Sequence, residues 1–369
     1  MDAVVCADEV GRGRPLRAGG LGTWLGLTLV LVLCLNTLGG WVRLSGSGLA
    51  IPQWPILTRE DGSRTLLPPM GVGEWAAAFA QFQEDQGRLR DLVRQGVLSV
   101  HDLGRQPATL SEYQGMYWTE WCHRLLAGLV GAWLVAVTAL LWRDPAQRRS
   151  AWLMTVAVGF TGVQAVLGGM LVHHGTGTRW LFLHQANAGV IVGLLVWALL
   201  AQLRAGDGVA SAQVRRLPWI GWTAAVLLGA IWLQLIAGAW LAASRDGVQA
   251  GMAQAVWRWP WDLWDAASGV GGNLLDNHAW HLWLHAWIVV AIVGILAWLL
   301  LLVRRGSPER LRLAVWVAAT FVGVQALLGL MSVTAADAYV SLAHQFAGMC
   351  LFCAATIACH DAWNAAEAA

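Results

Sequence analysis

The sequence predicts an all-α polytopic membrane protein, with eight transmembrane helices arranged as two tandem four-helix bundles. Three observations predict this class. The 369-residue chain is 57% hydrophobic and only 12% charged, a composition typical of a membrane protein. Eight apolar segments are long enough to cross a bilayer. The second half of the chain also repeats features of the first half.

The eight predicted spans are runs of about 20 mostly apolar residues. A short polar tail, residues 1–20, precedes the first of them. The spans cover residues 21–41, 118–142, 151–171, 182–203, 217–242, 279–303, 311–332 and 339–360.

Arginines concentrate in the short loops after the second, fourth and sixth spans. By the positive-inside rule, these loops and both termini are cytoplasmic. The long loop 42–117 is therefore external. Apolar residues recur with a helical period over 74–100, which predicts a small amphipathic cap on the membrane surface.

The third and seventh spans carry nearly the same segment. GVQAVLG at 162–168 returns as GVQALLG at 323–329, with six of seven positions identical. Because four spans restore the starting orientation, we expect a parallel repeat. Its amino-terminal half is 21–204, including the external loop, and its carboxy-terminal half is 205–369.

Four histidines follow the same duplication, near the outer starts of the even-numbered spans: His123, His184, His285 and His344. Two facing imidazoles from different helices can ligate one haem iron axially. A single intramembrane histidine could instead hydrogen-bond a neighbouring helix, but four at one depth favour ligands. Zinc or copper is less natural, because each half offers few nearby carboxylates or thiolates. The pattern predicts one haem in each half.

The two halves differ beside their first histidine. Glu120 lies one helical turn outside His123, whereas the matching position before His285 is Leu282. This asymmetry suggests the hypothesis that chemistry occurs in the amino-terminal half and electron supply in the carboxy-terminal half. Alternatively, Glu120 is an acid favoured by the dipole at the helix amino terminus.

Several other polar residues need an interpretation. Four arginines at outer span ends could pair with haem propionates or extend to lipid headgroups: Arg43, Arg124, Arg179 and Arg245. The remaining histidines are expected at the surface (His101, His173, His174), in solvated or packing roles (His278, His281), or away from the haem sites (His360). Cys350 and Cys353 are interpreted as small hydrophobic residues rather than a redox or metal pair.

The sequence resembles the haem A synthase family, in the branch shared by proteobacteria and mitochondria, over essentially its whole length. The motifs that carry the resemblance are GWVRLSGSGL at 40–49 with PQWP at 52–55, YWTEWCHR at 117–124, Asn273, Asp276, Asn277 and His285 in the sixth-span region, and His344-Gln345.

The resemblance implies conversion of haem O to haem A, with the C8 methyl oxidised to a formyl group through successive hydroxylations. It implies that His123 and His184 hold the substrate haem and that His285 and His344 hold a haem b. Glu120 matches the family's acid beside the substrate methyl. The departures, Ala286 for Arg, Asp276 for Glu and His281 for Gln, concentrate in the second half.

Two other functions stay open. One is a dihaem b-type electron-transfer cytochrome without porphyrin chemistry, and the other is a transporter with repeat symmetry. The implied location is a bacterial inner membrane, with the haem sites towards the periplasm. The implied partners are haem O synthase, an electron donor or acceptor and membrane lipid. A homo-oligomer is left open, and no feature indicates nucleic acid.

Overall fold

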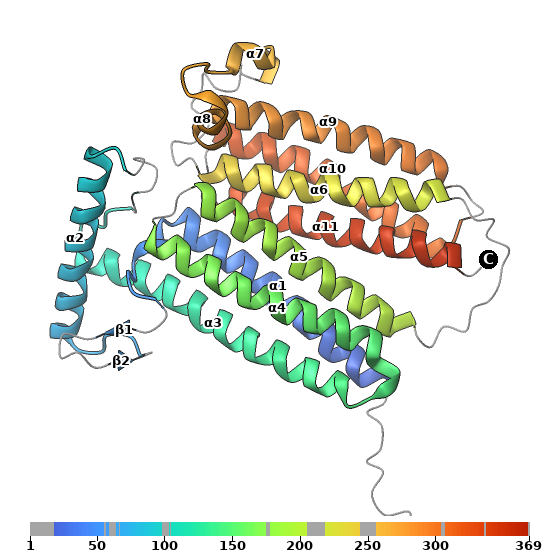
Figure 1. Ribbon diagram of the computed structural model, residues 1–369, viewed down its shortest axis with the longest axis horizontal. Helices are drawn as coiled ribbons and strands as arrows, with labels where there is room; N and C mark the ends of the chain where they lie inside the picture. Colours follow the sequence, from blue (N-terminus) through green and yellow to red (C-terminus); the bar gives the residue numbers. More distant parts are fainter. Residues whose placement is uncertain are drawn as a thin grey trace, which may run out of the picture.

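The computed structural model describes residues 18–54, 57–58, 64–65, 67–97, 103, 105–174, 178–204, 218–243, 256–303, 307–335 and 337–367. Long helices lie side by side and shorter elements cover one end of the bundle (Figure 1). The long helices are α1 (Ala18–Leu44), α3 (Leu110–Trp142), α4 (Arg148–His173), α5 (Thr178–Arg204), α6 (Pro218–Ala243), α9 (His278–Leu302), α10 (Glu309–Ala335) and α11 (Ala338–Glu367).

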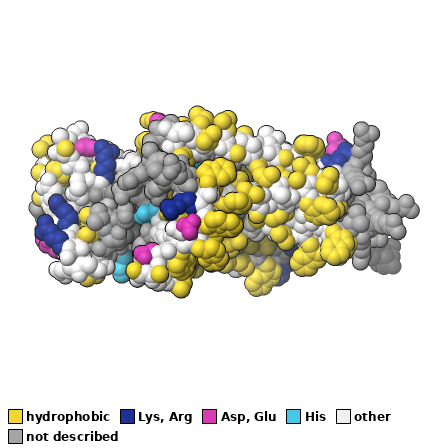
Figure 2. All heavy atoms as spheres, turned by 90° about the horizontal axis from the view of Figure 1, so that it is seen from above, with side chains coloured by type: hydrophobic (Ala, Val, Ile, Leu, Met, Phe, Trp, Pro, Cys, Tyr) yellow, Lys and Arg dark blue, Asp and Glu magenta, His cyan; other side chains and the backbone are white. Residues whose placement is uncertain are grey.

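The prediction of a helical protein with eight membrane spans is confirmed. Among the described residues, eight helices are long and apolar enough to cross a membrane, and each coincides with one predicted span. Figure 2 shows apolar side chains over the long middle of the bundle, with charged side chains gathered towards its ends. Leu129, Val135 and Val166 are among the large apolar side chains that the long helices expose. Such a belt suits contact with lipid rather than water.

The largest boundary difference from the prediction lies at the start of α3. Helix α3 begins at Leu110, about two turns before the predicted start at 118. Thr109 caps the helix by accepting a hydrogen bond from the Glu112 amide at 3.2 Å, and the Glu112 carboxylate accepts from the Ala108 amide at 2.8 Å. This reciprocal capping stabilises the extra turns beyond the apolar run.

The segment between α1 and α3 folds against the amino-terminal end of α3. Helix α2 (Val72–Arg94) lies across the end of the bundle (Figure 1), which confirms a helix in the predicted 74–100 stretch. Trp75 and Phe82 of α2 are buried against Tyr113 and Tyr117 of α3. The apolar face of α2 is thus covered by protein. A two-stranded antiparallel ribbon, β1 (Leu57–Thr58) with β2 (Arg64–Thr65), lies in the same segment.

The two predicted halves meet along α5 and α11, the most buried of the eight spans. Helix α5 contacts α6 and α11, and α1 contacts α11, so helices of both halves share one apolar core. The short helices α7 (Pro260–Leu263) and α8 (Gly269–Asp276) precede α9 at the end of the bundle that carries α2 (Figure 1). Short folded elements therefore cover both halves at that end of the bundle.

Candidate functional site

The four predicted histidines lie towards one end of the bundle. They belong to α3, α5, α9 and α11, which run in the same direction from the end that carries α2 and α8 (Figure 1). Each ring is half-buried, and each has a buried Nδ1 atom without a hydrogen-bond partner among the described residues. Four imidazoles with unused nitrogen atoms in an apolar bundle are candidate ligands.

One pair of histidines is brought together directly. In the carboxy-terminal half, the ring centroids of His285 and His344 lie 6.4 Å apart, at an interplanar angle of 71°. In the amino-terminal half, His123 lies on α3 and His184 on α5. Each pair joins two different helices, as axial ligation requires.

Each of the four rings faces a glycine on a neighbouring helix. An added Cβ atom would lie 3.0 Å from His123 at Gly39, 3.7 Å from His184 at Gly168, 3.1 Å from His285 at Gly238 and 3.2 Å from His344 at Gly329. The glycines therefore leave room beside the rings. Sequence reasoning missed their role, although Gly168 and Gly329 close the repeated seven-residue segment.

Two glutamines in the repeated segment hold the ligand helices. Gln164 donates to the backbone oxygen of His184 at 3.1 Å, and Gln325 donates to that of His344 at 2.7 Å. Asn187 also donates to the Gln164 side chain, at 2.5 Å. The same contact thus recurs in both halves and sets the height of α5 against α4 and of α11 against α10. The repeat was the sequence signal for this role.

Glu120 lies one turn from His123 on α3, as the spacing predicts, and its side chain is 3% exposed. Its Oε2 atom accepts a hydrogen bond from the Ile51 amide at 2.9 Å, and its Oε1 atom pairs with Arg124. The carboxylate is therefore also part of the contact between α3 and the segment that links α1 to α3.

Arg124 binds the same loop segment as Glu120, and the two side chains together form a clamp on residues 51–54. Its guanidinium donates to the backbone oxygens of Ile51 at 2.6 Å and Gln53 at 2.5 Å. It also lies 5.4 Å from the ring centroid of Trp54. The Trp54 indole lies against Gly169 of α4, so close that an added Cβ atom at Gly169 would be 2.6 Å from the indole Nε1 atom. Together Glu120 and Arg124 hold segment 51–54 beside the His123 pair.

Of the other three predicted propionate partners, only Arg43 has a described side chain. Arg43 is half-buried in the last turn of α1. The side chain of Arg179 and all of Arg245 lie outside the described residues, as do the side chain of Asp276 and all of His101.

The remaining histidines separate into surface and packing positions. His173 and His174 are exposed, as expected. His281 is buried, stacks on Trp240 at 5.1 Å and has its Nε2 atom 2.9 Å from the Leu274 oxygen. These contacts agree with a packing role.

His360 lies far from the four paired histidines along α11, near the opposite end of the bundle, as expected. It is nevertheless buried, with its Nδ1 atom 2.8 Å from Arg204 of α5. Arg204 also pairs with Asp361. This polar cluster joins the two innermost helices at that end.

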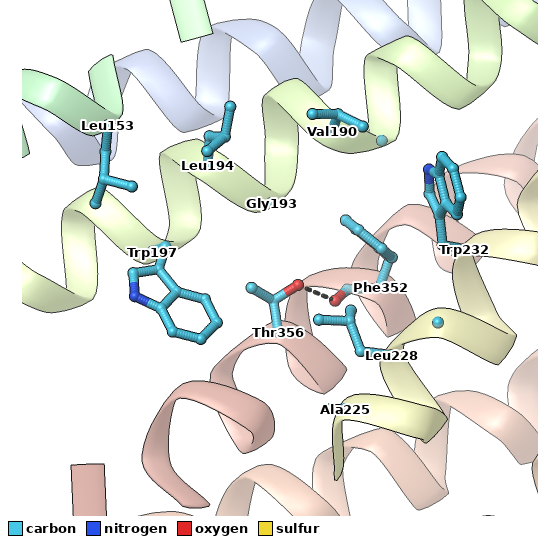
Figure 3. Close-up of a pocket in the computed structure, with 12 residues that line it drawn as sticks. Leu153, Val190, Gly193, Leu194, Trp197, Ala225, Leu228, Trp232, Phe352 and Thr356 are labelled. Atoms are coloured by element: carbon cyan, nitrogen blue, oxygen red, sulfur yellow. Dashed lines mark hydrogen bonds between the residues drawn. The ribbon is translucent and has the colours of Figure 1, made fainter. Parts of the chain in front are cut away.

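An apolar groove of about 480 Å³ lies between α5, α6 and α11 (Figure 3). Trp197 and Trp232 line it, with Gly193 between them on one wall. The Thr356 hydroxyl donates to the Phe352 backbone oxygen at 2.8 Å. No ionisable side chain lines this groove, so it is separate from the histidine pairs.

Comparisons with known proteins were made for the whole chain. The sequence model of the COX15-CtaA family, described as a cytochrome oxidase assembly protein, matches residues 22–356. Similar proteins include the Heme A synthase of Caulobacter sp. (strain K31), 30% identical over 94% of this chain and 95% of the relative. The Heme A synthase of Rhizorhabdus wittichii is 30% identical over 93% of this chain and 94% of the relative. The Heme A synthase of Paracoccus denitrificans is 28% identical over 92% of this chain and 87% of the relative.

Proposed function

Because the chain belongs to the COX15-CtaA family of cytochrome oxidase assembly proteins, we propose that it is a haem A synthase. The reaction we propose oxidises the C8 methyl of haem O to a formyl group through successive hydroxylations. The observation that carries the proposal is four intramembrane histidines with unused Nδ1 atoms, two of them in direct ring contact, in a chain whose relatives are named Heme A synthase.

The residues present fit two haem groups. Two imidazoles bound to one metal ion, each at about 2 Å, keep their rings close to the 6.4 Å separation of His285 and His344. The described residues hold no group of three or more His, Cys, Asp or Glu side chains around one point. A metal ion held by only two protein side chains must take its other ligands from elsewhere, and a porphyrin would supply them.

We assign the two pairs different tasks. His285 and His344 would hold a resident haem b, which supplies one-electron redox chemistry when bound. His123 and His184 would hold haem O as the substrate. The facing glycines leave room for ring adjustment, and the glutamines on the ligand helices keep the helices in register.

We assign Glu120 to the substrate methyl. Its negative charge would stabilise cationic character at the oxidised carbon, or its carboxylate would take a proton. The neighbouring Arg124 holds the carboxylate and segment 51–54 in place. Buried in the bundle, the acid acts with little competition from water.

The proposed setting is a bacterial inner membrane, with both termini cytoplasmic and the histidine pairs towards the periplasm. Haem O synthase would supply the substrate, and an electron partner would complete the redox balance. Arg43, Arg124, Arg179 and Arg245 are proposed partners for haem propionates.

The test is haem extraction with mass analysis from membranes that contain this chain and a haem O synthase, with membranes containing the synthase alone as the control. Haem A, or its hydroxylated precursor, is expected only when both proteins are present. Unchanged haem O beside a bis-histidine spectrum, in the presence of a competent reductase, would favour the dihaem electron-transfer cytochrome instead.

A further inference from the structure

We propose that Gln345 is a positioning residue that couples the two histidine pairs through helix α1. This inference rests on the proposed function only in that the carboxy-terminal pair holds a haem. Gln345 directly follows His344 on α11, in one half. Its contacts on α1 belong to the other half.

The contact is polar and spans most of the chain. The Gln345 Nε2 atom lies 3.2 Å from the backbone oxygen of Asn36 and 3.4 Å from the Asn36 Oδ1 atom, so it can donate to either. Near it, Trp41 of α1 stacks on Tyr339 of α11, with ring centroids 5.3 Å apart. The start of α11 is therefore fastened to the end of α1.

Two adjacent glycines make α1 fit between the sites. An added Cβ atom at Gly40 would lie 2.6 Å from the Gln345 Nε2 atom, closer than real Cβ contacts allow. An added Cβ atom at Gly39 would lie 3.0 Å from the His123 ring. Neighbouring residues of a helix point about 100° apart. One turn of α1 thus contacts the His123 ring and, on another face, the residue beside His344.

The equivalent turn of α6 lacks this arrangement. Gly238 faces His285 as Gly39 faces His123, and each glycine lies two residues before a tryptophan. In α6, however, Ala239 stands where Gly40 stands in α1, and Leu235 stands where Asn36 does. The side chain of Gln185, which follows His184, makes no hydrogen bond to another described residue. The coupling contact therefore occurs on one side only.

A shift of α11 at Gln345 must therefore move α1, and α1 packs against His123. Energetic coupling travels through such chains of packed and hydrogen-bonded groups. It is also reciprocal, so a change at the His123 pair should be felt at the His344 pair. Gln345 would hold the two histidine pairs at a fixed separation and orientation.

The experiment is a double-mutant cycle with Gly40→Ala and Gln345→Ala in the full-length protein, purified with its haem. The first readout is the low-spin electron paramagnetic resonance signal of the haem on His285 and His344, which reports the orientation of the axial imidazoles. The second readout is the thermal unfolding midpoint in detergent. Gln185→Ala is the matched control.

We expect Gly40→Ala to shift the resonance signal, although α1 supplies no ligand to that haem. Gln345→Ala should also shift it. Adding Gly40→Ala to Gln345→Ala should cause no further change, because the displaced amide is gone. The unfolding midpoint should behave likewise, so that the double variant unfolds at the same temperature as Gln345→Ala alone. The control Gln185→Ala should leave the resonance signal unchanged.

Additive effects on both readouts, or a resonance signal unchanged in Gln345→Ala, would overturn the inference. If the Gly40→Ala protein does not accumulate, the inference is tested by comparing the resonance signals of Gln345→Ala and Gln185→Ala. Only Gln345→Ala should then differ from the unmodified protein. Absence of haem from the unmodified protein would count against the proposed function. In that case the unfolding cycle still decides whether Gly40 and Gln345 are coupled.

Discussion

At the scale of single residues, Glu120 has two roles that compete for one carboxylate. It is the acid beside His123 that we assign to the substrate, and it also accepts the Ile51 amide and pairs with Arg124. Removing one partner of a buried ion pair leaves the other charge uncompensated. A loss of activity in a Glu120 variant therefore does not by itself identify a chemical role.

Comparison of Glu120→Gln with Arg124→Gln separates the two roles. The glutamine in Glu120→Gln keeps an acceptor for the Ile51 amide but carries no charge. If the charge serves the reaction, this variant should lose about a hundredfold or more in haem A formation. Arg124→Gln keeps the acid but weakens the clamp, and should lose less activity.

The check is single-turnover haem A formation beside thermal unfolding for each variant. Either variant could lower the free energy of unfolding by about 3 kcal/mol, because both disturb the buried pair. If the activity losses simply follow the stability losses in both variants, Glu120 has only a structural role in holding segment 51–54.

The four histidines should also differ in what their loss removes. His285→Ala or His344→Ala should abolish the spectrum of the resident haem b, because one axial ligand is lost. His123→Ala or His184→Ala should keep that spectrum and mainly impair turnover. Haem content by optical difference spectra, measured beside haem A yield, tests this assignment. Equal loss of one haem from every variant would contradict the division of tasks.

At the scale of elements, helix packing depends on the glycines that face the histidine rings. Gly168 and Gly329 hold the same place in the repeated segment, yet their surroundings differ. An added Cβ atom would make ordinary contact with His184 at 3.7 Å but a crowded one with His344 at 3.2 Å. The two positions therefore form a matched pair.

Gly329→Ala should shift the spectrum of the resident haem or lower its content, whereas Gly168→Ala should be tolerated. The physical reason is that a well-packed interior yields little to an added methyl group. Optical and resonance spectra of the two purified variants provide the check. An equal response at both positions would mean that the neighbouring helices give way and that the glycines are not needed for ring placement.

The packing of the segment between α1 and α3 is a second feature at the scale of elements. The Tyr113 hydroxyl lies 3.2 Å from the Ala50 oxygen and 3.1 Å from the Ala78 oxygen. Through these groups, α3 holds both the segment clamped by Glu120 and helix α2. The segment between α1 and α3 is therefore held on the helix that carries His123, and it covers that end of the bundle.

At the scale of the whole molecule, orientation in the membrane decides which side receives substrate and electrons. The arginine distribution predicts an external 42–117 loop and cytoplasmic loops after the even-numbered spans. Val97, after α2, and Ala146, between α3 and α4, are both exposed and lie on opposite sides of the predicted membrane. They make suitable positions for labelling.

In intact cells with a permeable outer membrane, a membrane-impermeant thiol reagent should label Val97→Cys. Ala146→Cys should react only after the inner membrane is opened. The parent chain, with its native cysteines, measures the background. Labelling of Ala146→Cys alone in intact cells would reverse the proposed orientation and move the histidine pairs to the cytoplasmic side.

Much of the architecture was predictable from the sequence, because the relevant forces act within one segment. A run of apolar residues must cross the bilayer as a helix, so all eight spans were found. The same reasoning placed the four histidines towards one end, since depth follows from position along a helix. The start of α3 was missed because capping and packing against α2, rather than hydropathy, extend it.

Contacts between distant segments were decided only by the tertiary structure. The sequence showed Glu120 beside His123 but not its hydrogen bond to Ile51, 69 residues away. It showed Gln345 beside His344 but not its contact with Asn36, 309 residues away. Helical period determines which face and depth a residue occupies. Which side chain lies opposite depends on how the helices pack against one another, and no single segment contains that information.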